Sequence, residues 1–199
     1  MSNYKSLGRE IQFILPILFS LILFFITNII GLFDIHDLAY WSGKIYREPL
    51  RIFLYSFVHV DLNHLLSNLF GIVILRYSLI KLNSQNNKLF ILLLLFIIPL
   101  QTIYLYILDN YFFYEYNNLL VGLSGAIYGS FSFLMMSSYF GKESLLHIYI
   151  GLKRNLEIFK LLSFLLSFGI IFSLLPGVSF NGHLGGIISG IIIFYISGK

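Results

Sequence analysis

The chain has 199 residues, of which 58% are apolar and only 11% are charged, and its mean hydropathy is +0.85. Soluble domains carry about 25% charged residues, so this composition excludes an ordinary globular protein and indicates an integral membrane protein. Cysteine is absent, which excludes disulfides and thiolate metal sites. The net charge of +4 fits basic cytoplasmic loops better than nucleic-acid binding. We therefore expect the lipid bilayer as a partner and no nucleic acid.

Six stretches approach the roughly 20 apolar residues that a membrane-spanning helix needs. The predicted spans are residues 11–33, 60–80, 89–108, 119–140, 156–175 and 182–197. The segment 34–58 is too polar to span and rich in aromatic residues, which prefer the membrane interface. We predict that it lies there as a loop. No cleavable signal peptide, soluble domain or long repeat is evident, so the predicted fold class is an all-α membrane protein, one six-helix bundle over residues 1–199.

The basic residues predict the orientation of the bundle. With six crossings, ten Lys and Arg residues fall on the side of the N-terminus and three on the other side. Cytoplasmic loops carry the excess of Lys and Arg, so both termini are predicted to be cytoplasmic. The second, fourth and sixth spans then begin at the outer face, and we expect the bacterial inner membrane with a site opening to the extracytoplasmic side.

Those three spans all begin with polar residues. His64 and Asn68 share one face of the second span, Ser124 opens the fourth, and His183 opens the sixth. Polar side chains at membrane depth are costly and usually face the bundle interior or a water-filled cavity. Ser124 taken alone is more simply explained by helix packing. Three polar signals at one depth favour a functional site instead.

A serine and a histidine at this depth predict a catalytic pair. A serine hydroxyl is a weak nucleophile that needs a neighbouring base, and histidine suits that role near neutral pH. Small residues at four-residue spacing let two helices approach closely. They occur on both predicted helices, at Gly125 and Gly129 and at Gly182, Gly186 and Gly190. No acid lies near His183 in the sequence, so the prediction is a Ser-His dyad.

Acyl transfer also needs hydrogen-bond donors for the developing oxyanion. The Asn68 amide and the His64 ring could supply them, together with the backbone N–H of Ser124 at a helix start. Tyr128 lies one turn after Ser124 and could stack on the His183 imidazole. We expect no metal and no cofactor in this site.

Three motifs in order resemble the rhomboid family of intramembrane serine proteases. Gly122-Leu-Ser-Gly125 followed by Tyr128 resembles its GxSG motif. The run His59 to Asn68 resembles its HxxxxHxxxN pattern, and Gly182-His183-Leu-Gly-Gly186 resembles its last-helix histidine. Arg51 resembles the basic residue of the first outer loop. The resemblance covers most of the chain, from about Glu48 to Gly190.

The resemblance implies that Ser124 is the nucleophile and His183 the general base, with His64, Asn68 and the Ser124 amide as the oxyanion site. It implies substrates that are single-pass membrane proteins with a helix-destabilising segment. The family often has Gly-Gly and a Glu near the end of the second helix, where this chain has Arg76-Tyr77-Ser78. Leu50 replaces the tryptophan that often precedes the loop arginine. These departures concern helix-end packing and loop anchoring.

Other function classes fit the residues less well. A metalloprotease would need HExxH, but His59 and His64 are five residues apart with no Glu between them. An aspartyl protease needs two acids in the spans, where Asp61 is the one candidate, and a transporter would show broken helices or repeats. An inactive rhomboid-like chaperone or binding protein is the remaining alternative. The sequence names neither the substrate nor the oligomeric state.

Overall fold

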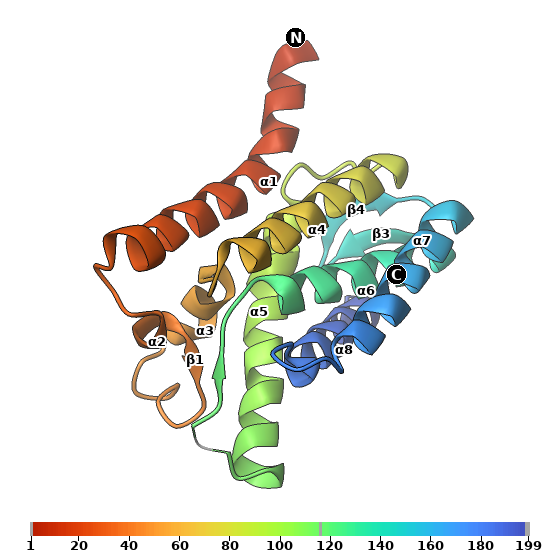
Figure 1. Ribbon diagram of the computed structural model, residues 1–199. Helices are drawn as coiled ribbons and strands as arrows, with labels where there is room; N and C mark the ends of the chain where they lie inside the picture. The colour runs from red at the N-terminus through yellow and green to blue at the C-terminus, as the bar shows by residue number, and fades with distance from the viewer. Residues whose placement is uncertain (1, 116, 198–199) are drawn as a thin grey trace.

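The computed structural model describes residues 2–115 and 117–197, and this part of the chain is predominantly helical (Figure 1). Each predicted span overlaps one long helix. These helices are α1 (Ser2–Phe24), α4 (Leu62–Lys81), α5 (Leu89–Ile107), α6 (Ser124–Phe140), α7 (Leu156–Phe172) and α8 (Phe180–Ile196). The shorter helical elements are η1 (Phe25–Ile30), α2 (Ile35–Leu38), α3 (Arg51–Leu54), η2 (Tyr55–Phe57) and η3 (Leu108–Phe112).

Two small antiparallel sheets depart from a purely helical prediction. Strand β1 (Tyr40–Trp41) pairs with β2 (Leu119–Leu120), and β3 (Lys142–Leu145) pairs with β4 (Ile148–Leu152). Residues 119–123, predicted as the start of a helix, are therefore not helical, and α6 begins only at Ser124. The physical reason is that pairing with β1 satisfies backbone polar groups of Leu119 and Leu120, and the Gly122 N–H donates to the carbonyl oxygen of Tyr55, as membrane depth requires.

The helices differ in how well they match a membrane crossing by length. Within residues 2–115 and 117–197, two helices are long and apolar enough on their own, Gly8–Ile30 and Leu89–Phe112. The pair Arg51–Phe57 and Leu62–Lys81, bent by 97°, makes a third if it is one span. Helix Phe180–Ile196 is apolar but shorter. The fold is thus that of a helical membrane protein.

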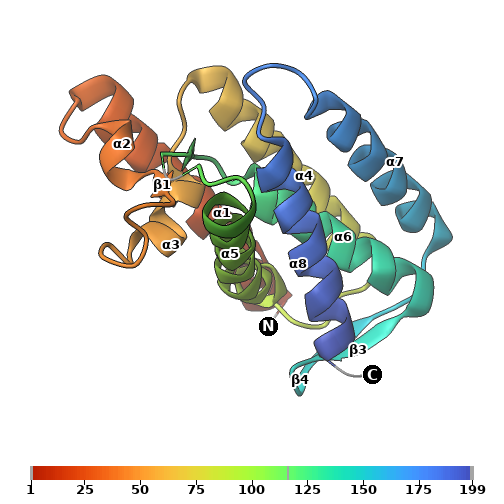
Figure 2. The ribbon, with the colours of Figure 1, turned by 90° about the horizontal axis from the view of Figure 1, so that it is seen from below.

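Helix α6 lies in the middle of the bundle and contacts α4, α5, α7 and α8 (Figures 1 and 2). Its buried side chains occur on every face, including Ile127, Ser130, Phe133 and Leu134. A helix that is enclosed on all sides in this way must be uncharged, and α6 carries no charged residue. The surrounding helices therefore fix the position of its first residue, Ser124.

Helices α6 and α8 approach so closely at their glycines that no side chain fits between the two backbones. A Cβ atom at Gly186 would overlap the carbonyl oxygen of Gly125, and one at Gly190 would overlap the carbonyl oxygen of Gly129. Across the same seam, the Ser132 hydroxyl donates to the carbonyl oxygen of Ile187 at 2.9 Å. The small-residue spacing thus brings two backbones into contact, as the sequence predicted.

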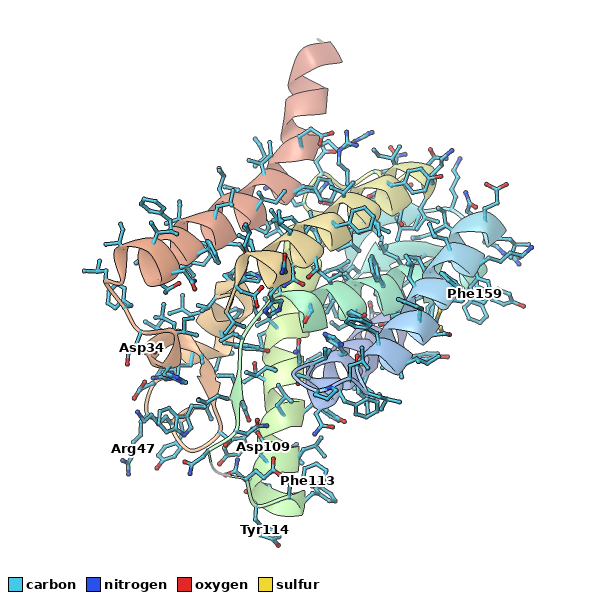
Figure 3. The ribbon with its side chains drawn as sticks, viewed as in Figure 1. Asp34, Arg47, Asp109, Phe113, Tyr114 and Phe159 are labelled. Atoms are coloured by element: carbon cyan, nitrogen blue, oxygen red, sulfur yellow. The ribbon has the colours of Figure 1, made fainter. Side chains whose placement is uncertain are left out.

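Buried polar groups hold the segment 34–58 together and join it to the bundle. Arg51 is 4% exposed, and its Nη1 donates to the carbonyl oxygens of His36 and Ala39 at 2.8 and 2.7 Å. The hydroxyl of Tyr40 donates to Asp109 at 2.9 Å. Burial raises the pKa of Tyr40, and the Asp109 carboxylate raises it further, so this hydroxyl remains a donor. Figure 3 shows Asp109 at the end of α5, on the side of the molecule where Arg47 lies.

The close contact between the glycines of α6 and α8 predicts that adding one methyl group destabilises the protein at a glycine in this contact but not at a glycine outside it. Gly190→Ala should lower the stability of the protein by about 1–3 kcal/mol, because its Cβ has no space, even though alanine favours a helix more than glycine does. Gly8→Ala is the matched control, since its Cβ would meet only Asn87, at 3.8 Å. Thermal unfolding in detergent measures both. Equal melting temperatures for the two variants would contradict the close contact between α6 and α8 at Gly190.

Candidate active site

Ser124 lies at the start of α6 because the preceding turn requires a glycine. Gly122 has φ +108°, a conformation that other residues rarely adopt, and its N–H donates to the carbonyl oxygen of Tyr55 at 2.9 Å. Two residues later the helix begins, so the Ser124 amide has no partner one turn earlier in the helix. The turn therefore presents both the hydroxyl and the N–H of Ser124 at one helix end.

His183 contacts this hydroxyl from the first turn of α8. Its Nε2 lies 2.9 Å from the Ser124 Oγ, and the residue is 7% exposed. Ser179 caps the helix by accepting from the Gly182 N–H at 3.0 Å. The ring of Tyr128 stacks on the imidazole with centroids 4.3 Å apart and an interplanar angle of 6°. The structure thus brings together three residues that the sequence predicted to meet.

Two further polar residues contact the first turn of α8, one at His183 and one at Gly182, and the sequence did not predict either of them. The Nδ1 of His183 lies 2.5 Å from the Oγ of Ser173, which follows α7 and is 2% exposed. Gln101 of α5 donates its amide to the carbonyl oxygen of Gly182 at 3.1 Å. Both are polar residues inside predicted apolar spans, which is the signal that could have identified them.

Gly125 and Gly182 leave space near Ser124 and His183 for different neighbouring residues. A Cβ at Gly125 would overlap the Gln101 side chain, so this glycine leaves space for the Gln101 amide beside α6. Gly182 does not contact α6 as its spacing suggested. A Cβ there would lie 2.9 Å from the Ser179 Oγ and 3.2 Å from Leu120. Its role is to let the cap and the segment before α6 approach the start of α8.

His59, which precedes α4, forms a linked group with His64 and Asn68 of α4 beside Gly122. The Nδ1 of His59 lies 3.1 Å from the carbonyl oxygen of Phe57. Because a carbonyl can only accept, this nitrogen carries the proton, and the Nε2 of His59 accepts from the Asn68 amide at 2.8 Å. His59 is fully buried, with its ring centroid 5.0 Å from that of His64. His59 therefore orients Asn68.

His64 and Asn68 line the peptide that precedes the serine. A Cβ at Gly122 would overlap the His64 ring and lie 3.5 Å from the Asn68 amide nitrogen. Both side chains therefore lie beside the turn that ends in the Ser124 N–H. Arg51 is not brought to this site, because its guanidinium is engaged inside the 34–58 segment.

The end of α4, where the chain carries Arg76 in place of small residues, has its own contact. The Arg76 Nε and Nη2 donate to the Glu10 carboxylate of α1 at 2.6 and 2.9 Å. A bidentate pair of this kind fixes the orientation of both groups. The exposure of the pair limits its contribution to stability. It links α1 to α4 at the end far from Ser124.

One comparison with known proteins found a family match. The family model described as the Rhomboid domain matches residues 46–199. That range includes α4 to α8 and every residue of the described site. No curated protein matched the chain. On the strength of the family match over more than three quarters of its length, the chain belongs to the rhomboid family of membrane proteins.

Proposed function

We propose that this protein is an intramembrane serine endopeptidase that uses Ser124 as nucleophile and His183 as general base. The observation that carries the proposal is the 2.9 Å separation of the Ser124 Oγ and the His183 Nε2, beneath the stacked ring of Tyr128. Family membership supports it, since rhomboid proteins are generally intramembrane serine proteases. A serine with a base within hydrogen-bond reach, itself held by further groups, is the arrangement that nucleophilic catalysis needs.

The reaction proceeds in two halves. The Ser124 Oγ attacks the carbonyl carbon of the scissile peptide bond while its proton passes to the His183 Nε2. The same nitrogen then protonates the departing amine as the C–N bond breaks, which leaves an ester on Ser124. A water molecule attacks the ester and gives its proton to Nε2, and that proton returns to Ser124 when the carboxylic acid leaves.

The oxyanion of each tetrahedral intermediate needs donors that are already in place. The proposal assigns the Ser124 N–H, the His64 ring and the Asn68 amide to this role. Their position around Gly122 supports it, because the reacting carbonyl must lie next to the Ser124 Oγ. His59 acts only through Asn68 and Tyr128 only through His183, so both are positioning residues.

The membrane arrangement forms part of the same proposal. Residues 1–199 form one domain that crosses six times, with both termini cytoplasmic and the site on the extracytoplasmic side of the inner membrane. Helix α6 has 17 residues. At 1.5 Å per residue it is about 25 Å long, against about 30 Å of hydrocarbon. A helix this short leaves Ser124 below the outer boundary, and single-pass membrane proteins can present an extended segment to it.

Labelling with a fluorophosphonate serine probe tests the pair. Wild-type protein in detergent should be labelled, whereas Ser124→Ala and His183→Ala should each lose labelling, because the nucleophile is absent in one and inactive in the other. Ser130→Ala is the matched control, since this buried serine of α6 donates only to the carbonyl oxygen of Ala126. Absence of labelling in the wild type would favour the inactive, chaperone-like alternative. Equal labelling in all four proteins would exclude Ser124 as the nucleophile.

The oxyanion role of Asn68 has a separate test. Asn68→Ala should lower kcat by about 100-fold, as the loss of one oxyanion donor does in other enzymes, with KM and the melting temperature little changed. Asn63→Ala provides the control, because Asn63 lies on the same helix but is exposed. Turnover of a transmembrane substrate in proteoliposomes is the measurement. Unchanged kcat in Asn68→Ala would remove Asn68 from the site.

A further inference from the structure

Ser173 is a buried hydroxyl on the side of His183 away from Ser124. Its Oγ lies 2.6 Å from the carbonyl oxygen of Gly169 and 2.5 Å from the His183 Nδ1. Three elements meet at this point, since Ser173 follows α7, His183 belongs to α8 and Ser124 belongs to α6. The two nitrogens of one imidazole thus contact two different serines.

The Ser173 hydroxyl has one proton, and the position of that proton determines which atom donates and which accepts in each contact. The Gly169 oxygen is a carbonyl and can only accept, so a proton placed in that contact comes from the Ser173 Oγ. The Oγ then has only lone pairs left for His183. The Nδ1 of His183 must therefore carry the proton of the neutral ring, which leaves Nε2 free to accept from Ser124. Tautomers are assigned from such networks.

We propose that Ser173 is a positioning residue that holds His183 in the tautomer with Nδ1 protonated, the form in which Nε2 can act as a base. The consequence for catalysis rests on the proposed function, whereas the tautomer itself does not. In serine proteases with a triad, a carboxylate holds the histidine in this way. Here a serine hydroxyl, itself oriented by a backbone carbonyl, takes that place, and it is a third member that the sequence did not predict.

The C-terminal end of α7 also favours a positive charge on His183. Ser173 is the C-cap residue of this 17-residue helix, and the helix dipole places a partial negative charge at that end. His183 becomes positively charged when it takes the proton of Ser124. The Nδ1–H of His183 then donates to the Ser173 Oγ, whose own proton is engaged by the Gly169 carbonyl, and it lies at the negative end of the α7 dipole. This arrangement stabilises the imidazolium without a buried acid.

Other buried serines show what Ser173 would look like with a purely structural role. Ser137 of α6 is fully buried and donates to the carbonyl oxygen of Phe133, four residues earlier, at 2.8 Å. Ser189 of α8 donates to that of Gly185 at 2.7 Å. Ser173 makes the same bond and in addition meets the Nδ1 of His183. Because Ser173 comes from α7, the base is correctly protonated only while the end of α7 packs against α8.

A pair of variants of equal shape tests the role of Ser173 in catalysis. Ser173→Thr keeps the hydroxyl and Ser173→Val replaces it with a methyl group, so any cost of the larger side chain is common to both. We expect Ser173→Val to have a kcat about 10- to 100-fold below that of Ser173→Thr, the cost of one buried donor without an acceptor, with equal KM. Ser137→Val controls for the loss of a buried serine bond and should keep the wild-type kcat.

The tautomer is measured directly by ¹⁵N NMR of the full chain with labelled histidine, in detergent. The His183 signals are those that disappear in His183→Gln. Wild type and Ser173→Thr should show Nδ1 protonated, and Ser173→Val should shift the proton toward Nε2. An Nε2-protonated ring in the wild type, or equal spectra and equal kcat for the Thr and Val variants, would overturn the inference. This readout needs no activity, so a protein that fails to react with fluorophosphonate still tests Ser173.

Discussion

The contact between the α6 and α8 backbones is the constraint on which the rest of the site depends. Gly125 and Gly129 face Gly186 and Gly190 so closely that a single methyl group would overlap a carbonyl oxygen. With larger residues the helices would separate, and the 2.9 Å contact between Ser124 and His183 would be lost. In a bilayer, where lipid is as apolar as leucine, packing of small residues is a main source of helix association. The same glycines thus hold α6 and α8 together and bring the Ser124 hydroxyl next to the His183 imidazole.

Irregular backbone at membrane depth is tolerated here only where its polar groups are satisfied. The extended residues before Ser124 pair with Tyr40 and Trp41. Within the segment 34–58, Arg51 donates hydrogen bonds to backbone carbonyl oxygens. These bonds replace the ones that a helix would have made. They also explain why Gly122 can turn the chain so sharply into α6. The segment 34–58 therefore acts as a scaffold for the start of α6 and contributes no residue to the reacting pair.

The sequence predicted the residues that have a chemical signature of their own. Six apolar stretches marked the long helices, and Ser124, His183 and Tyr128 were predicted to meet, as they do. The start of α6 was missed because an apolar run does not reveal where pairing with a distant strand replaces a helix. Ser173 and Gln101 were missed because their roles depend on which helix faces them. The Arg76–Glu10 pair was likewise invisible, since it joins residues 66 positions apart.

The position of a covalent adduct reports which hydroxyl is the nucleophile and whether His183 activates it. Wild-type protein treated with a fluorophosphonate, digested and examined by mass spectrometry should carry one adduct, on the Oγ of Ser124. The reason is that the Ser124 hydroxyl has the His183 Nε2 at 2.9 Å and lies at the end of a turn that is lined by the polar side chains of His64 and Asn68. Ser124 should be modified in the wild type, and His183→Ala should abolish the adduct. An adduct on another serine, or one on Ser124 that forms equally well without His183, would contradict it.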